Sequence, residues 1–176
     1  WLANADNIIL EVNAQQSLLL EGMHDVYNDI GMPPNRTPIP LVTSGERIGT
    51  PYLHCDLDKV VAVVLTDSAD RNSKFADPDE CSNKIASHII NFFHDEVAKG
   101  RMPENLLPIQ SGVGNVANAV LAGLQNSPFE QLTGYTEVLQ DGMLDLIMSG
   151  KMTMASATAL SLSPDALARF NANIEE

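Results

Sequence analysis

The sequence predicts an α/β protein with a mostly parallel sheet that is flanked by helices. Short segments of β-branched and apolar residues alternate with segments whose apolar residues recur at helical spacing. This alternation indicates parallel strands, because two parallel strands must be joined by a crossover connection, which is usually an α-helix. Residues 7–12 predict one strand, and residues 59–65 (KVVAVVL) predict another that is buried on both faces.

The middle of the chain contains the clearest breaks in this pattern. Residues 31–51 are rich in proline and glycine, which excludes a regular helix and predicts an extended, looping path. Residues 66–80 are polar and aperiodic, which is typical of a linker. An amphipathic helix is predicted for residues 82–99, with Asp79 or Ser82 as its N-cap.

The alternation continues to the last residues. The other predicted segments are strands at 106–110, 135–139 and 152–157 and helices at 115–124, 141–149 and 164–171.

The composition excludes several classes of function. The 23 acidic and 10 basic residues give a net charge of −13, which argues against a nucleic-acid partner and against an anionic membrane surface. The apolar runs are too short to cross a bilayer. Two cysteines, Cys55 and Cys81, do not make a disulfide framework, and we expect a reducing compartment. The chain opens at Trp1 without a signal-peptide pattern, and we expect it to be a piece of a longer protein.

The first motif is a glycine-rich turn at residues 111–115, SGVGN, between a predicted strand and a predicted helix. Glycines allow a sharp turn and close approach of a ligand to the backbone. The helix that begins near Asn115 directs its free N–H groups at this turn, which makes an anion or oxyanion site from backbone alone. A plain strand-to-helix turn without a ligand explains this motif equally well.

A dinucleotide-binding fingerprint is a second interpretation of the same residues. Gly112, Gly114 and Ala117 fit the pattern G-x-G-x-x-A, and Glu137 lies about where a ribose-binding acid is expected. The pattern is short and common, so it favours an NAD(P)-binding domain only weakly.

The second motif is Glu137 within residues 134–142, GYTEVLQDG. A single carboxylate among apolar and uncharged residues at the end of a strand can be a base or a nucleophile if it is partly buried. The alternative is an ordinary surface glutamate. His88 and His94 are six residues apart on one predicted helix, which is poor spacing for a shared metal, and we expect no metal site.

Residues 111–120 (SGVGNVANAV) and 134–146 (GYTEVLQDGMLDL) together resemble the acetyl-CoA hydrolase/transferase family. Segments 8–13 (IILEVN), 47–52 (RIGTPY) and 105–114 (NLLPIQSGVG) extend the resemblance over nearly the whole chain. This family belongs to the class I CoA-transferases, which include acetate-using enzymes and the related 4-hydroxybutyrate and butyrate CoA-transferases. The GVGNVANAV form is closer to the acetate-using branch.

The resemblance implies an incomplete two-domain fragment of the CoA-transferase type. Residues 1–65 correspond to the end of the N-terminal domain, residues 66–81 to the linker, and residues 82–176 to the first part of the C-terminal domain. We expect the full-length protein to be a homo-oligomer in the cytoplasm, or in the mitochondrion of a eukaryote.

The resemblance also implies a mechanism and a set of site residues. Glu137 corresponds to the catalytic glutamate, which forms a glutamyl-CoA thioester, and the backbone N–H of Val113 to an oxyanion-hole donor. The implied substrates are coenzyme A as an acyl-CoA and a small carboxylate such as acetate or succinate, with acyl-CoA hydrolysis if water attacks instead. The implied CoA contacts are Gln110, Ser111, Gly112, Val113, Gly114 and Asn115.

Overall fold

A computed structural model describes residues 2–28, 31, 33–72 and 77–174 of the chain. It divides into two compact units. The first comprises most of residues 1–71, and the second comprises most of residues 72–172 together with Val42–Gly45. Each unit is described by itself.

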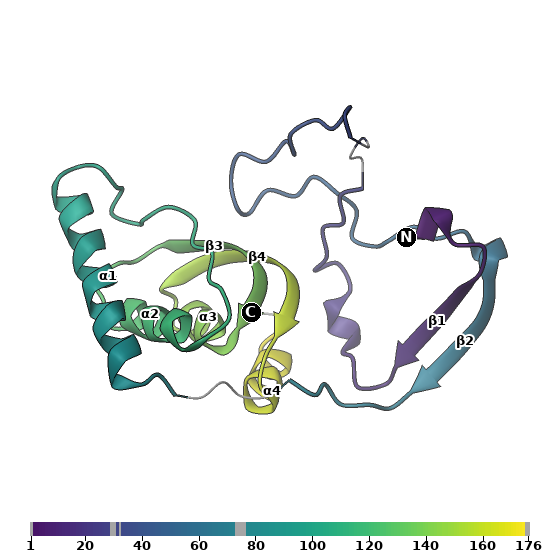
Figure 1. The fold of residues 1–176 in the computed structure, drawn as a ribbon. Helices are drawn as coiled ribbons and strands as arrows, with labels where there is room; N and C mark the ends of the chain where they lie inside the picture. The colour runs from purple at the N-terminus through teal and green to yellow at the C-terminus, as the bar shows by residue number, and fades with distance from the viewer. Residues whose placement is uncertain (1, 29–30, 32, 73–76, 175–176) are drawn as a thin grey trace. The chain divides into compact units, whose positions relative to one another are not determined.

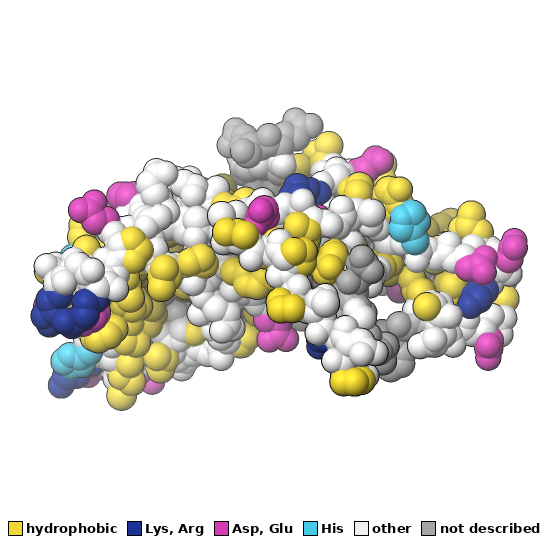
Figure 2. All heavy atoms as spheres, turned by 90° about the horizontal axis from the view of Figure 1, so that it is seen from above, with side chains coloured by type: hydrophobic (Ala, Val, Ile, Leu, Met, Phe, Trp, Pro, Cys, Tyr) yellow, Lys and Arg dark blue, Asp and Glu magenta, His cyan; other side chains and the backbone are white. Residues whose placement is uncertain are grey.

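The first unit contains one sheet of two parallel strands, β1 (Ile8–Asn13) and β2 (Val60–Thr66) (Figure 1). Both strands were predicted, but the prediction that β2 is buried on both faces is wrong. Val61 is 60% exposed and Leu65 is 79% exposed. The reason is that no α-helix in the described part of the first unit packs on either face of this sheet, so the apolar side chains of β2 stay on the surface. Figure 2 shows that hydrophobic side chains are part of the molecular surface.

The proline-rich part of this unit is held by side chains that bond to the backbone. Val26 and Thr50 form an isolated antiparallel bridge. The Asp25 carboxylate accepts hydrogen bonds from the backbone N–H groups of Ile48 (3.1 Å) and Gly49 (2.7 Å). The predicted looping path is therefore fixed by polar contacts, since proline leaves few backbone donors for regular structure.

The second unit is an α/β arrangement with a parallel pair of strands, which confirms the predicted fold class. Strands β3 and β4 run parallel, with Gly134 opposite Ala155 and Leu139 opposite Leu160. The elements in chain order are α1 (Glu80–Ala98), α2 (Asn115–Gln125), β3 (Leu132–Gln140), α3 (Asp141–Met148), β4 (Met152–Ser161) and α4 (Pro164–Ala172) (Figure 1).

Helix α1 begins at Glu80, two residues before the predicted start, and its N-cap is Asp79, one of the two predicted candidates. The Asp79 carboxylate accepts a hydrogen bond of 2.7 Å from the backbone N–H of Ser82, which caps the helix. The helix packs closely on α2, because a Cβ placed on Gly123 would lie 3.1 Å from Cγ1 of Ile90. None of the helices in the described residues is long and apolar enough to cross a membrane.

The hydrophobic core of the second unit lies between its helices and its two strands. Helix α3 packs against β3 and β4, α2 packs against α3, and α1 packs against α2. Side chains with almost no exposed surface fill this space. They include Leu121, Leu124, Leu132, Met143, Leu146, Met152 and Leu162.

The predicted strand at 106–110 is present only as a single parallel bridge between Ile109 and Gly134. Leu106 has a φ of 58°, outside the extended region, and Pro108 has no backbone N–H to donate. Ile109 still donates to the Thr133 carbonyl (2.8 Å), so the chain that leads to the glycine-rich turn runs along the edge of β3.

Candidate functional site

The predicted glycine-rich turn leads directly into α2. Ser111 is buried, whereas Val113 is 62% exposed. Gly114 is the N-cap residue with a φ of 143°, and no side chain caps the helix. The first intrahelical bond joins the N–H of Asn118 to the Gly114 carbonyl (3.0 Å), so earlier N–H groups of α2 have no partner within the helix. These N–H groups and the helix dipole favour an anion or a developing oxyanion.

Two side chains of β3 bind this turn. The single hydroxyl proton of Thr136 is shared between the carbonyls of Ser111 (3.2 Å) and Val138 (3.3 Å). Gln140 Nε2 donates to the carbonyl of Gly112 at 2.8 Å. Both side chains are buried, with exposed fractions of 7% and 1%. The turn and the strand are thus joined by hydrogen bonds between residues 25 and 28 positions apart in the sequence.

Glu137 lies between these two residues on the same strand. It is exposed, and it lies within β3, three residues before the last residue, Gln140. Side chains alternate along a strand, so Glu137 is on the face opposite Thr136 and Gln140. Its carboxylate has no hydrogen-bond partner among the described residues, while its backbone carbonyl accepts a bond of 2.6 Å from Thr158 Oγ1. Of the two interpretations of this carboxylate, the described residues show the exposed glutamate, because no described element covers this face of β3 at Glu137.

The predicted CoA contacts form one continuous segment, and the structure joins this segment to β3, the strand that carries Glu137. Gln110, Gly112 and Asn115 are exposed along the turn and the start of α2. Sequence reasoning did not identify Thr136 and Gln140 as part of the site. A signal was available, because both are polar residues at positions that share the inward face of a strand.

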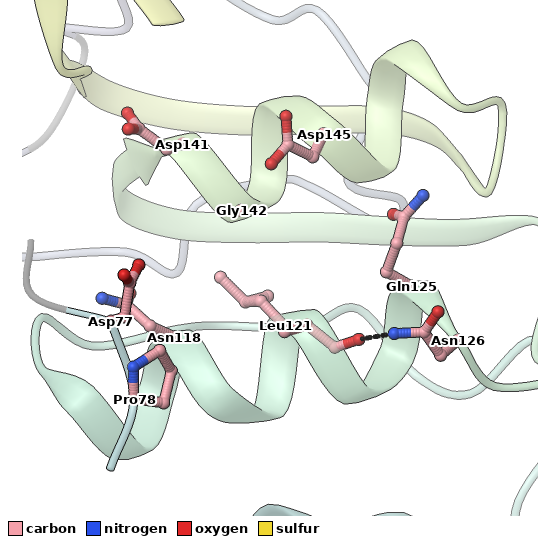
Figure 3. Close-up of a pocket in the computed structure, with 10 residues that line it drawn as sticks. Asp77, Pro78, Asn118, Leu121, Gln125, Asn126, Asp141, Gly142 and Asp145 are labelled. Atoms are coloured by element: carbon pink, nitrogen blue, oxygen red, sulfur yellow. Dashed lines mark hydrogen bonds between the residues drawn. The ribbon is translucent and has the colours of Figure 1, made fainter. Parts of the chain in front are cut away.

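A separate cavity of about 250 Å³ lies between α2, α3 and the residues that precede α1 (Figure 3). It contains none of the predicted site residues, and its acidic lining of Asp77, Asp141 and Asp145 disfavours a phosphorylated ligand. Two of these carboxylates have protein partners. Asp141 accepts from the backbone N–H of Ser163 (2.8 Å), and Asp145 pairs with Arg169 (2.8 Å).

The described residues contain no group of three His, Cys, Asp or Glu side chains that could hold a metal ion. The site contains an unpaired carboxylate on β3 and a turn of backbone N–H donors that is hydrogen-bonded to this strand. This combination can supply a nucleophile and an oxyanion stabiliser.

Several curated proteins match nearly the whole chain. The succinyl-CoA:acetate CoA-transferase of Clostridium kluyveri is 48% identical over 170 residues, which cover 97% of this chain and 31% of that protein. The acetyl-CoA hydrolase of Schizosaccharomyces pombe is 44% identical over 171 residues, 97% of this chain and 32% of that protein. The acetyl-CoA hydrolase of Saccharomyces cerevisiae is 42% identical over 175 residues, 99% of this chain and 33% of that protein. No family model matches the chain.

The chain is homologous to the acetyl-CoA hydrolase/transferase family. These similarities confirm the resemblance identified from the motifs of the sequence. It spans about a third of the length of these relatives.

Proposed function

We propose that the protein containing this chain transfers CoA between an acyl-CoA and a small carboxylate through a glutamyl-CoA thioester on Glu137. The observation that carries the proposal is the placement of an unpaired carboxylate on the strand that binds the glycine-rich turn. Relatives named as a succinyl-CoA:acetate CoA-transferase and as acetyl-CoA hydrolases support acyl-CoA, acetate and succinate as the substrate class.

The reaction begins with attack of the Glu137 carboxylate on the carbonyl carbon of the acyl-CoA. The C–S bond breaks, CoA leaves as a thiolate, and a mixed anhydride remains on Glu137. The thiolate then attacks the glutamyl carbonyl of this anhydride. The acyl group leaves as a carboxylate, and CoA is held as a thioester on Glu137.

The second half repeats these steps in the opposite order. The acceptor carboxylate attacks the thioester carbonyl, which releases the thiolate and forms a new anhydride. The thiolate attacks the acyl carbonyl of that anhydride, which gives the new acyl-CoA and the free carboxylate of Glu137. If water attacks the thioester instead, the products are CoA and free Glu137, and the net reaction is hydrolysis.

Each step places negative charge on a carbonyl oxygen, and the turn supplies donors for that charge. We assign the Val113 N–H as the oxyanion donor, next to the uncapped start of α2. One such donor is worth roughly 2.7–4 kcal/mol of transition-state stabilisation. The exposed turn residues Gln110, Gly112 and Asn115, with the buried Ser111 and the N-cap Gly114, are the proposed CoA contacts.

The dinucleotide alternative has less support. A ribose-binding acid is expected near the end of a strand that follows the glycine-containing strand and helix. Here residues 106–110 form only one bridge, and Glu137 lies inside β3. The named relatives are CoA enzymes, and among these the acetate-using type is favoured over the 4-hydroxybutyrate or butyrate type.

The test compares Glu137→Gln with Glu104→Gln in the full-length protein. Both substitutions remove one exposed carboxylate, but only Glu137 lies on β3, the strand whose Gln140 side chain binds the turn. We expect Glu137→Gln to reduce CoA transfer from acetyl-CoA to succinate to background, with unchanged thermal stability, and Glu104→Gln to retain full activity. Retention of activity by Glu137→Gln would exclude Glu137 as the nucleophile, and NADH binding would then be measured.

A further inference from the structure

Gln140 is a buried polar residue whose hydrogen-bonding capacity is only partly used. Its side chain is 1% exposed, and Nε2 donates to the Gly112 carbonyl at 2.8 Å. Its Oε1 atom has no hydrogen-bond partner among the described residues. A buried acceptor without a partner is unfavourable, so an apolar side chain of similar shape would serve the core at least as well. The bond to Gly112 is what distinguishes glutamine from such a residue.

The hydrogen bond from Gln140 to the Gly112 carbonyl also affects the N–H group of Val113. The carbonyl of Gly112 and the N–H of Val113 belong to one planar, trans peptide group, so they point in opposite directions. A donor that fixes the Gly112 carbonyl therefore also fixes the direction of the Val113 N–H. In the same way, the bond from Thr136 to the Ser111 carbonyl fixes the N–H of Gly112.

The turn receives little support from its own side chains, since the Ser111 hydroxyl donates to the Gly112 carbonyl at 3.3 Å, a longer bond than the 2.8 Å bond from Gln140. Gly112 and Gly114 give the backbone wide conformational freedom, and a Cβ at either position would contact nothing within 4 Å. No side chain caps α2. Donors stabilise a transition state effectively only when they are oriented before the reaction.

We propose that Gln140 and Thr136 are positioning residues that orient the oxyanion-hole peptide groups, with Gln140 acting on the Val113 N–H. This inference rests on the proposed function. These two residues, the anchors of the turn, lie on the same strand as Glu137: Thr136 directly precedes it, and Gln140 follows it by three residues. A shift of β3 would then move Glu137 and the oxyanion donor together.

The test is Gln140→Met in the full-length protein, because methionine keeps the length of glutamine and lacks its donor. We expect kcat to fall about 10- to 100-fold, less than or similar to the loss of an entire oxyanion donor. The Kd for free CoA should stay within about twofold of wild type, because free CoA has no acyl carbonyl for the oxyanion hole. KM for acetyl-CoA should change little as well, because the donor binds the charged transition state more strongly than the neutral carbonyl. A merely structural role would change CoA binding together with kcat.

The matched control is Gln125→Met, since the Gln125 side chain accepts a bond from Ser149 and touches neither anchor nor turn. Thr136→Val is the second variant if Gln140→Met does not fold, and a smaller fall in kcat is expected from it. Wild-type kcat in the anchor variants, with a thioester formed normally at Glu137, would overturn this inference alone. If the wild-type protein forms no thioester at Glu137, the proposed function fails and this inference fails with it.

Discussion

Gly114 and Gly112 allow a paired test of the turn, because the same substitution has opposite consequences at the two positions. Gly114 has a φ of 143°, which side-chain-bearing residues rarely adopt, whereas Gly112 lies outside that region. A Cβ at either position would meet no atom within 4 Å. Any difference in stability between Gly114→Ala and Gly112→Ala therefore reports backbone strain alone.

The magnitude follows from this geometry. Gly114→Ala should lower the free energy of unfolding by about 1–3 kcal/mol, the usual cost of a residue in such a conformation. Gly112→Ala should raise it by up to roughly 1 kcal/mol, because alanine restricts the unfolded chain. Thermal unfolding should show a lower Tm for Gly114→Ala by roughly 2–12 °C, given the usual shift per kcal/mol for a domain of this size.

The assay is thermal unfolding of both variants beside wild type, followed by steady-state kinetics. Because the Gly112 Cβ would project into the open space proposed for acyl-CoA, Gly112→Ala should raise KM for acetyl-CoA although the protein is stable. Equal stability of the two variants would refute the account of Gly114 as a strained N-cap.

Two further predictions concern the second unit. Leu124→Ala should lower the free energy of unfolding by about 2–5 kcal/mol in urea denaturation, because Leu124 is 0% exposed in the core; a loss below 1 kcal/mol would contradict the packing. The hydrogen bond from the Ser82 N–H lowers the pKa of Asp79 in the folded protein, so its stabilisation is present at neutral pH and is lost as the pH falls through that lowered pKa. Asp79→Ala should therefore lower Tm at neutral pH by an amount that shrinks in acid, and a difference independent of pH would count against this cap.

Most elements of the second unit were predicted from the sequence, because the apolar residues that mark each helix or strand there are also the residues that pack in its core. Helix α1 was predicted from its apolar spacing and from the cap at Asp79, and β3, α3, β4 and α4 from their alternation. The burial of β2 was predicted wrongly. An apolar segment indicates that a strand can be buried, but it does not show whether other elements cover its faces. Leu106 and Pro108 prevented a regular strand where composition alone favoured one.

The residues of the site were predicted by motif, and their arrangement was not. Spacing placed the turn at the start of α2, and the structure has it there. That Thr136 and Gln140 bind the carbonyls of Ser111 and Gly112 could not be derived from the sequence, because it depends on which edge of β3 the turn follows. The roles of Glu137 and Val113 stay predictions.

The most direct test of the central claim is reduction of the covalent intermediate. The full-length protein is incubated with acetyl-CoA and then with borohydride, and the peptide that contains Glu137 is analysed by mass spectrometry. The account predicts that the thioester at Glu137 is reduced to the alcohol, with the mass shift absent in Glu137→Gln. An unmodified Glu137 peptide from a folded protein that binds CoA would contradict the assignment of Glu137 as the nucleophile.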